Sequence, residues 1–244
     1  RERKFNTAGP SIAGDHYMID PLQRIELPEV ETLIDDKRYF VLHAPRQTGK
    51  TTCLLALMQY LNAQGRYQAL YANIEAAQAL RSDVERGMMT VVTQIAQQAD
   101  IHIQEARFKN WAQEALREAG AAGALTVVLA RWAREAGKPV VLMLDEVDAL
   151  VGDTLISLLR QIRAGYGQRP EAFPQSVILC GVRDVRDYRI HTGHNEIITG
   201  GSAFNIKAES LRLGSFSADE VTALYAQHTQ DTGQTFAPGI FAEL

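Results

Sequence analysis

The stretch VLHAPRQTGKTTCLLA, residues 41–56, places a polar, positively charged loop between two apolar segments. The first segment has the pattern of a buried strand, and the leucines after Gly49 recur at helical spacing. Gly49, Lys50 and Thr51 stand where the loop enters the helix. An ordinary turn would produce this break, and so would a loop that holds phosphate groups, so the surrounding residues must decide between the two.

The loop matches the phosphate-binding pattern G-x-x-x-x-G-K-[ST] at every defining position except the first, where Ala44 replaces glycine. In such a loop the backbone N–H groups and the helix N-terminus hold the phosphates. Lys50 then contacts the β- and γ-phosphates, and the Thr51 hydroxyl binds Mg²⁺. A strand before and a helix after favour this interpretation over a chance G-K-T. The expected nucleotide-binding residues are Ala44, Pro45, Arg46, Gln47, Thr48, Gly49, Lys50, Thr51 and Thr52.

Two acidic residues end a second apolar segment, PVVLMLDE, residues 139–146. A run buried on both faces is typical of a central parallel strand. We expect this strand to neighbour the strand before the loop, so that Asp145 holds Mg²⁺ and Glu146 activates a water. Asp148 is either a further acid of the site or a helix cap.

Strand-like and helical segments alternate along the chain, which predicts a parallel sheet with helices on both faces. Five strands are expected, within residues 38–44, 67–74, 139–146, 176–182 and 209–216. Residues 80–136 have helical character, with breaks expected near Gly87, near Asp100 and over Gly120 to Gly123. Further helices are expected over 153–166, with Asp153 as N-cap, and over 217–230, opened by the capping box Ser217-x-x-Glu220. The fold class is therefore α/β, with three layers around a five-stranded parallel sheet.

The composition is that of an ordinary globular protein, with 244 residues, 46% hydrophobic residues and a net charge of −4. The acidic balance does not support a nucleic-acid-binding surface, although a local patch stays possible. Cys53 and Cys180 lie in apolar surroundings, which predicts buried, reduced thiols in a cytoplasmic protein. The longest apolar run is far too short to span a bilayer, so no membrane association is expected. The first residue is not Met and the chain stops without an evident closing element, which indicates an excised piece of a longer protein.

Four segments together resemble a known group of proteins: APRQTGKTT, VVLMLDEVD, VILCGVRD and LRLGSFSADEVTAL. They are similar to the P-loop ATPases with an additional catalytic acid, and within these to the AAA+/STAND-related ATPase-like domains. The resemblance implies ATP and Mg²⁺ as cofactors. It also implies that Arg183 is a sensor of the γ-phosphate, although an ion pair of Arg183 with Asp184 or Asp187 is an alternative.

The resemblance covers residues 36–231, the expected ATPase core domain. Residues 1–35 form a lead-in segment that is expected to lie over the adenine, where Tyr17 or His16 would stack; a surface histidine and a core tyrosine are equally compatible. Residues 232–244 are expected to begin a truncated lid or winged-helix region. Arg160 and Arg163 lie on one helix and would serve either as a finger toward another subunit or as a solvated face.

Three hypotheses about function follow. The first is a Mg²⁺-dependent ATPase in which Glu146, Lys50 and Arg183 are catalytic, Thr51 and Asp145 hold the metal, and hydrolysis drives conformational change. The second is a nucleotide-gated switch with slow turnover, in which ATP causes homo-oligomerisation or binding of an unidentified protein partner. The third is an ATP-dependent loader for DNA transactions, which the overall charge does not support.

Overall fold

A computed structural model describes residues 2–80, 83–184, 187, 189–191, 197–206, 208–237 and 240. Its centre is a five-stranded sheet in the order β2-β3-β4-β1-β7, in which all neighbours are parallel. The strands are β1 (Phe40–His43), β2 (Gln68–Asn73), β3 (Val140–Asp145), β4 (Ser176–Gly181) and β7 (Glu209–Arg212). The predicted five-stranded parallel sheet is thus confirmed.

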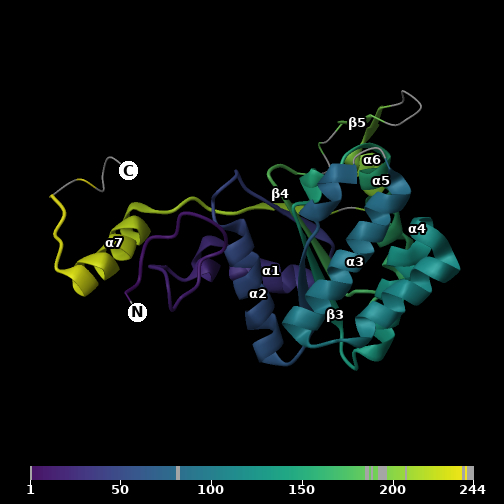
Figure 1. Ribbon diagram of the computed structural model, residues 1–244, viewed down its shortest axis with the longest axis horizontal. Helices are drawn as coiled ribbons and strands as arrows, with labels where there is room; N and C mark the ends of the chain where they lie inside the picture. Colours follow the sequence, from purple (N-terminus) through teal and green to yellow (C-terminus); the bar gives the residue numbers. More distant parts are fainter. Residues whose placement is uncertain are drawn as a thin grey trace.

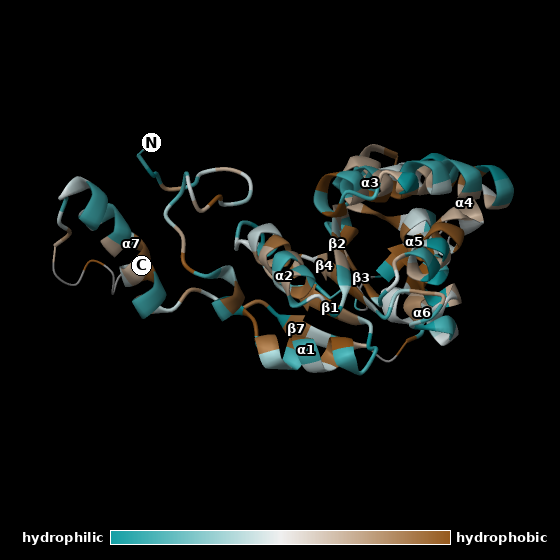
Figure 2. Cartoon of the chain, turned by 90° about the horizontal axis from the view of Figure 1, so that it is seen from below, coloured by the Kyte–Doolittle hydropathy of each residue, from teal (hydrophilic) through white to brown (hydrophobic). Residues whose placement is uncertain are grey.

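Helices cover both faces of the sheet, so the fold has the three layers that the sequence predicts (Figures 1 and 2). One face carries α1 (Leu27–Asp35) and α2 (Lys50–Gln64). The other carries α3 (Val84–Ile103), α4 (Arg107–Glu135) and α5 (Gly152–Ala164). Short elements complete the described chain: η1 (Pro21–Arg24), η2 (Glu75–Leu80), η3 (Val147–Ala149), η4 (Tyr166–Gln168), α6 (Gly200–Phe204) and the antiparallel pair β5 (Arg189–His191) and β6 (Ile197–Thr199).

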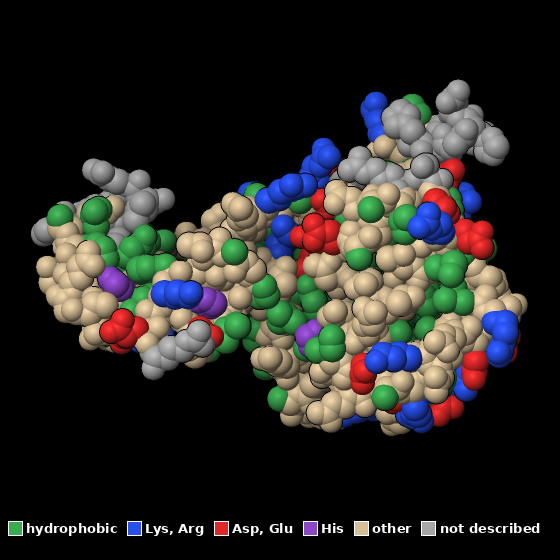
Figure 3. All heavy atoms as spheres, viewed as in Figure 1, with side chains coloured by type: hydrophobic (Ala, Val, Ile, Leu, Met, Phe, Trp, Pro, Cys, Tyr) green, Lys and Arg blue, Asp and Glu red, His purple; other side chains and the backbone are tan. Residues whose placement is uncertain are grey.

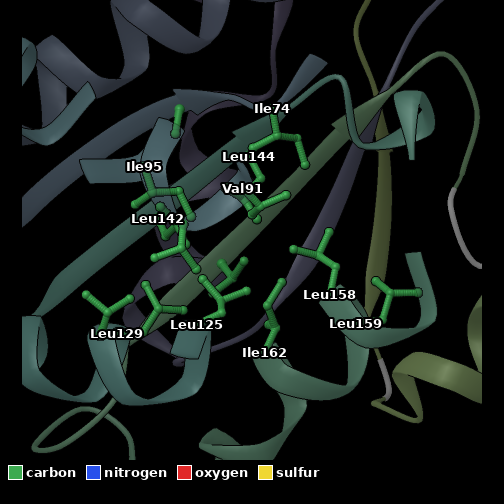
Figure 4. Close-up of a cluster of buried hydrophobic side chains, with 14 of the residues drawn as sticks. Ile74, Val91, Ile95, Leu125, Leu129, Leu142, Leu144, Leu158, Leu159 and Ile162 are labelled. Carbon is green, nitrogen blue, oxygen red and sulfur yellow. The ribbon is translucent and has the colours of Figure 1, made fainter. Parts of the chain in front are cut away.

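The larger part of the hydrophobic core lies between the sheet and the helices α3, α4 and α5 (Figure 4). Leu142 and Leu144 of β3 point into this layer, where they meet Val91 from α3 and Leu158 from α5. Every residue of β3 and β4 is buried. These two strands are covered on both sides, which explains their uninterrupted apolar sequences.

The helical region after residue 80 differs from the prediction in where it breaks. Helix α3 runs without interruption through Gly87, so the break expected there was wrong, whereas the break expected near Asp100 lies a few residues later, where α3 ends at Ile103. A Cβ on Gly87 would lie 2.8 Å from Thr154 Cγ2, and the glycine therefore allows close packing of α3 on α5. The chain turns at Gln104, which has a φ of 54°. The break near Gly120 is confirmed, because this residue leaves the helical conformation within α4.

The expected N-cap of α5 was also wrong by two residues. Val151 is the N-cap and α5 begins at Gly152. Asp153 therefore lies within the first turn, where its carboxyl group interacts favourably with the positive end of the helix dipole.

After β7 the chain leaves the sheet and forms α7 (Ala218–Thr232), which is opened by the predicted capping box of Ser217 and Glu220. Helix α7 lies beside the N-terminal segment, away from the helices that cover the sheet (Figure 1). Arg3 forms an ion pair with Asp231 at 3.0 Å, and Phe5 and Tyr17 pack on aromatic rings of α7. The first and last described segments therefore form one small unit next to the sheet; the domain boundaries that the sequence suggested stay a prediction.

The burial of β3 leads to a stability prediction. Leu142→Ala should lower the free energy of unfolding by about 2–5 kcal/mol, because Leu142 is fully buried and its loss leaves a cavity. Ile101→Ala is the control: Ile101 is 68% exposed on α3, and its truncation should change stability by about 0.5 kcal/mol or less. Urea unfolding of both variants measures the difference, and equal losses would contradict this account of the core.

Candidate functional site

The loop between β1 and α2 has the backbone geometry that the phosphate-binding interpretation requires. Gln47 and Gly49 have left-handed φ angles of 59° and 81°, and Gly49 is the N-cap of α2. Alternating conformations of this kind turn successive N–H groups toward one point and form a concave anion site. Such a site at the N-terminus of a 15-residue helix also gains from the helix dipole.

Ala44 departs from the glycine of the pattern, and its surroundings explain why alanine fits. Its side chain is buried in a small apolar cluster with Cys53 and Leu213. The methyl group therefore packs under the loop. Pro45, Arg46 and Gln47 are exposed on its outer side, and Thr48 donates a hydrogen bond to the Pro45 carbonyl at 2.7 Å.

Lys50 is buried against the loop that precedes it. Its Nζ atom donates hydrogen bonds to the carbonyl oxygens of Ala44 at 3.1 Å and Pro45 at 3.0 Å, and the residue is 6% exposed. A lysine ammonium group is a compact charge with three donors, so these two contacts leave one donor for a phosphate oxygen.

The carboxyl group of Asp145 accepts hydrogen bonds from three parts of the chain. Its Oδ2 atom accepts hydrogen bonds from the Thr51 hydroxyl at 2.7 Å and the Tyr71 hydroxyl at 3.0 Å, and its Oδ1 atom accepts one from the Glu146 N–H at 2.9 Å. Burial, and next the charge of Asp145, raise the pKa of Tyr71, so its hydroxyl remains a donor. The sequence predicted that Thr51 and Asp145 lie close together, but it did not predict the contact of Tyr71 with Asp145. In the sequence Tyr71 is only one residue of a strand with an alternating pattern.

The strand that carries Asp145 is not the neighbour of β1, contrary to the prediction. β4 lies between β1 and β3. Thr51 reaches Asp145 from the first turn of α2, and farther along the helix Met58 accepts a hydrogen bond from the Tyr71 N–H of β2. The two strand ends are thus joined by the start of α2 and not by adjacency in the sheet.

Glu146 directly follows Asp145 and has the left-handed backbone angles φ 60° and ψ 38°. Its burial raises the pKa of the carboxyl group, the nearby carboxyl groups of Asp145 and Asp148 raise it further, and Lys50 lowers it. A raised pKa suits a proton acceptor, because it brings the affinity of the carboxylate for a proton closer to neutral pH. Asp148 has a buried Oδ1 atom that lacks a hydrogen-bond partner within the described residues.

The oxygen atoms of Thr51 and Asp145 fit a magnesium site. Thr51 lies in the first turn of α2 and Asp145 ends β3, and both side chains present hard oxygen donors. Mg²⁺ commonly takes one or two protein ligands together with substrate phosphates and waters. Among the described residues, no cluster of three or more His, Cys, Asp and Glu side chains could hold a metal by itself. The geometry therefore fits a metal that is held jointly by protein and nucleotide.

The remaining predicted arginines are exposed. Arg183 lies two residues after the end of β4, on the side of the sheet where the C-terminal ends of β1 and β3 also lie. Arg160 and Arg163 are exposed on α5. On the face shown in Figure 3, the coloured basic and acidic side chains are interspersed and form no broad basic patch.

A pocket of about 160 Å³ adjoins the phosphate loop. Gly49 lines it from the loop, Thr52 from α2, Tyr17 and Phe5 from the N-terminal segment, and Leu224 from α7. Ser11 N–H donates to the Thr52 hydroxyl at 3.1 Å, which attaches the N-terminal segment directly to α2. Of the two aromatic candidates, Tyr17 lines the pocket, whereas the His16 ring accepts a hydrogen bond from Ile12 N–H.

Residues 33–188, more than half of the chain, match the family model described as an AAA domain. The chain belongs to this family. The match contains the phosphate loop, Asp145 and Glu146, and the P-loop ATPase resemblance of the sequence is confirmed. The pocket residues Phe5, Tyr17 and Leu224 lie outside the match. No curated protein matches the sequence.

Several solved structures share the fold of this AAA domain. CDC6P from Pyrobaculum aerophilum is 16% identical with a TM-score of 0.53, over 91% of this chain and 52% of that one. The Walker-type ATPase paby2304 of Pyrococcus abyssi is 13% identical with a TM-score of 0.59, over 98% and 65%. A DNA replication initiation factor is 12% identical with a TM-score of 0.50, over 93% and 57%. The chain thus spans between about half and two thirds of these proteins. None of its described helices is long and apolar enough to cross a membrane.

The three donors on Asp145 lead to a prediction for Tyr71. Tyr71→Phe should lower the free energy of unfolding by about 1.5–3 kcal/mol, because it removes a buried hydrogen bond to a carboxyl group. Tyr60→Phe is the matched control, since the Tyr60 hydroxyl donates to Glu31 at 2.9 Å in a less buried place, where water can replace the lost bond; its effect on stability should be clearly smaller. Denaturant unfolding measures both, and a larger loss for Tyr60→Phe would contradict the ranking.

Proposed function

We propose that this AAA domain binds ATP with Mg²⁺, hydrolyses it, and couples the nucleotide state to conformational change or assembly. The observation that carries the proposal is the meeting of three features at one end of the sheet. These are the left-handed turn of the loop before α2, the hydrogen bond between Thr51 and Asp145, and the raised pKa of the adjacent Glu146.

Each residue then has a role that follows from its place. The N–H groups of the loop and the start of α2 bind the phosphates, and Lys50 adds a positive charge beside the β- and γ-phosphates. Thr51 and Asp145 hold Mg²⁺, which supplies charge neutralisation on the phosphate oxygens when bound. Glu146 orients a water and accepts its proton, while Arg183 stabilises negative charge on the γ-phosphate.

The pocket beside the loop is the proposed place for the base and ribose. Gly49 and Thr52 form part of its wall, so it adjoins the phosphate loop, and its lining is largely apolar and aromatic. A purine would pack against such a surface, as ligands generally do in pockets with few polar groups. We assign the adenine to this pocket, with Tyr17 as one wall, and the N-terminal segment as its cover.

This assignment predicts the effect of filling the pocket. Leu224→Trp should weaken Mg·ATP binding by about tenfold or more, because a larger side chain would occupy the space of the base. Binding of magnesium tripolyphosphate should stay unchanged, since it uses the loop alone. Ala223→Trp, on the exposed side of the same helix, is the control. Calorimetry with both ligands tests this; an equal loss for tripolyphosphate would contradict the assignment.

A nucleotide-gated switch with slow turnover is the second candidate. It is favoured by the pocket itself, because residues of both the N-terminal segment and α7 line it. A nucleotide bound there would contact two segments that pack on each other outside the sheet, so its presence would alter their packing. Rapid hydrolysis would favour the first candidate, and ATP-dependent self-association with little hydrolysis the second. DNA loading, the third hypothesis from the sequence, is not carried by any contact of the described residues, and the formal net charge of −4 offers it no support.

The roles of Lys50 and Glu146 are separable by mutation. Lys50→Ala should abolish Mg·ATP binding, because it removes the charge beside the phosphates. Glu146→Gln should retain binding and reduce hydrolysis by about a hundredfold or more, because an amide cannot accept the proton of water. Calorimetry and phosphate release measure the two effects. Full turnover in Glu146→Gln would disprove its role as the base, and unimpaired binding in Lys50→Ala would disprove the phosphate site.

The experiment that tests the function as a whole is binding of Mg·ATP, Mg·ADP and Mg·GTP to the wild-type chain by calorimetry. Light scattering of the same samples shows whether ATP changes the oligomeric state. We expect ATP and ADP to bind, and the absence of any nucleotide binding would refute the proposal.

A further inference from the structure

We propose that Arg24 is a positioning residue that orients the phosphate loop and links it to the segment leading into α7. Arg24 ends the short helix η1, ahead of the ATPase core that the sequence suggested. It is 8% exposed, although arginine is rarely buried. The inference rests on the proposed function, because the loop is taken to bind phosphate.

The guanidinium group of Arg24 connects two backbone segments that are far apart in the sequence. Its Nη1 atom donates a hydrogen bond to the Thr48 carbonyl oxygen within the loop. Its Nε and Nη2 atoms donate to the Gly214 carbonyl oxygen, at 3.1 Å and 2.5 Å. The planar fork of donors on arginine makes such a double contact possible, whereas a lysine ammonium group lacks this geometry.

The contact with Thr48 fixes the direction of the next N–H group. A trans peptide is planar, and its C=O and N–H point in opposite directions. When Arg24 holds the Thr48 carbonyl on one side, the Gly49 N–H is therefore directed to the other side, away from the arginine. Two features of this arrangement favour glycine at position 49. Its φ is 81°, and a Cβ there would lie 3.0 Å from Arg24 Nη1.

The contact with Gly214 places the same guanidinium at the exit from the sheet. Gly214 follows β7 by two residues, and its own N–H donates to the Arg24 carbonyl oxygen at 2.9 Å. The Arg24 side chain also lies over the ring of Phe216, 4.0 Å from its centroid. Phe216 directly precedes the N-cap of α7. A rearrangement of the loop on phosphate binding is thereby transmitted to the start of α7 through one buried side chain.

Arg169 provides a matched control at the opposite end of the sheet. It donates to the carbonyl oxygens of Tyr166 and Lys37 and lies over the Tyr166 ring, 3.4 Å from its centroid. It thus makes the same kinds of contact as Arg24, two backbone carbonyls and an aromatic ring, but near the start of β1 and far from the loop.

The test compares Arg24→Met, Arg24→Lys and Arg169→Met with the wild-type chain in two measurements. The first is the Kd for Mg·ATP by calorimetry. The second is amide hydrogen exchange without nucleotide over residues 45–51 and 213–217. Arg24→Met should weaken ATP binding by about tenfold or more and speed exchange in both segments, because charge-assisted hydrogen bonds to both are lost. Arg169→Met should leave the Kd within about twofold and these segments unchanged.

Arg24→Lys retains the charge and the aliphatic stem, so it keeps the test valid if Arg24→Met does not fold. It should show the same changes at smaller amplitude, since its ammonium group does not reproduce the double contact. Faster exchange in the loop alone would overturn the proposed link. Unchanged exchange in both segments would also overturn it, even with weaker ATP binding, because Arg24 lines the pocket assigned to the base and its loss would then act by direct contact. If the wild-type chain binds no nucleotide, the proposed function fails, and ligand-free exchange alone then decides whether Arg24 connects the two segments.

Discussion

The buried carboxyl group of Asp145 is the point on which the site depends. A buried carboxyl group is costly unless donors surround it, and here the donors come from the start of α2, from β2 and from the chain that follows β3. To satisfy this one group, the phosphate loop and the acidic strand end must lie in a fixed relation. The same contacts keep Thr51 and Asp145 together as candidate metal ligands and direct the chain at Glu146 into its left-handed turn.

The fold supplies this arrangement at the edge where parallel strands end. Strands β3 and β4 are buried on both faces, so their polar groups are concentrated beyond their C-terminal ends. Helix α2 covers one face of the sheet, and its first turn holds Thr51 against Asp145 at the end of β3, although β4 lies between β1 and β3. The general rule that open α/β sheets bind ligands at the carboxyl ends of their strands follows here from burial: only at the strand ends can loops present charged groups.

A second unit completes the proposed nucleotide site. The N-terminal segment and α7 pack on each other through Phe5, Tyr17 and Tyr225, and both contribute to the pocket beside the loop. Arg24 stands where this unit meets the phosphate loop, with contacts to both. Recognition of the base and recognition of the phosphates are therefore assigned to different parts of the chain, and a single guanidinium group lies between them.

The sequence by itself determined the fold class and the five strands, and it predicted the phosphate loop and the two acidic residues of the site, because each depends on a local pattern: a short apolar run, a glycine that permits positive φ, or a lysine at a helix start. The break at Gly87 and the Asp153 cap were predicted wrongly, since glycine also allows close packing and acidic residues also interact with helix dipoles. Only the tertiary structure decided the strand order, which put β4 between β1 and β3, and the roles of Tyr71 and Arg24. These depend on contacts between residues that are distant along the chain, where no local pattern of hydrophobicity or turn residues carries information.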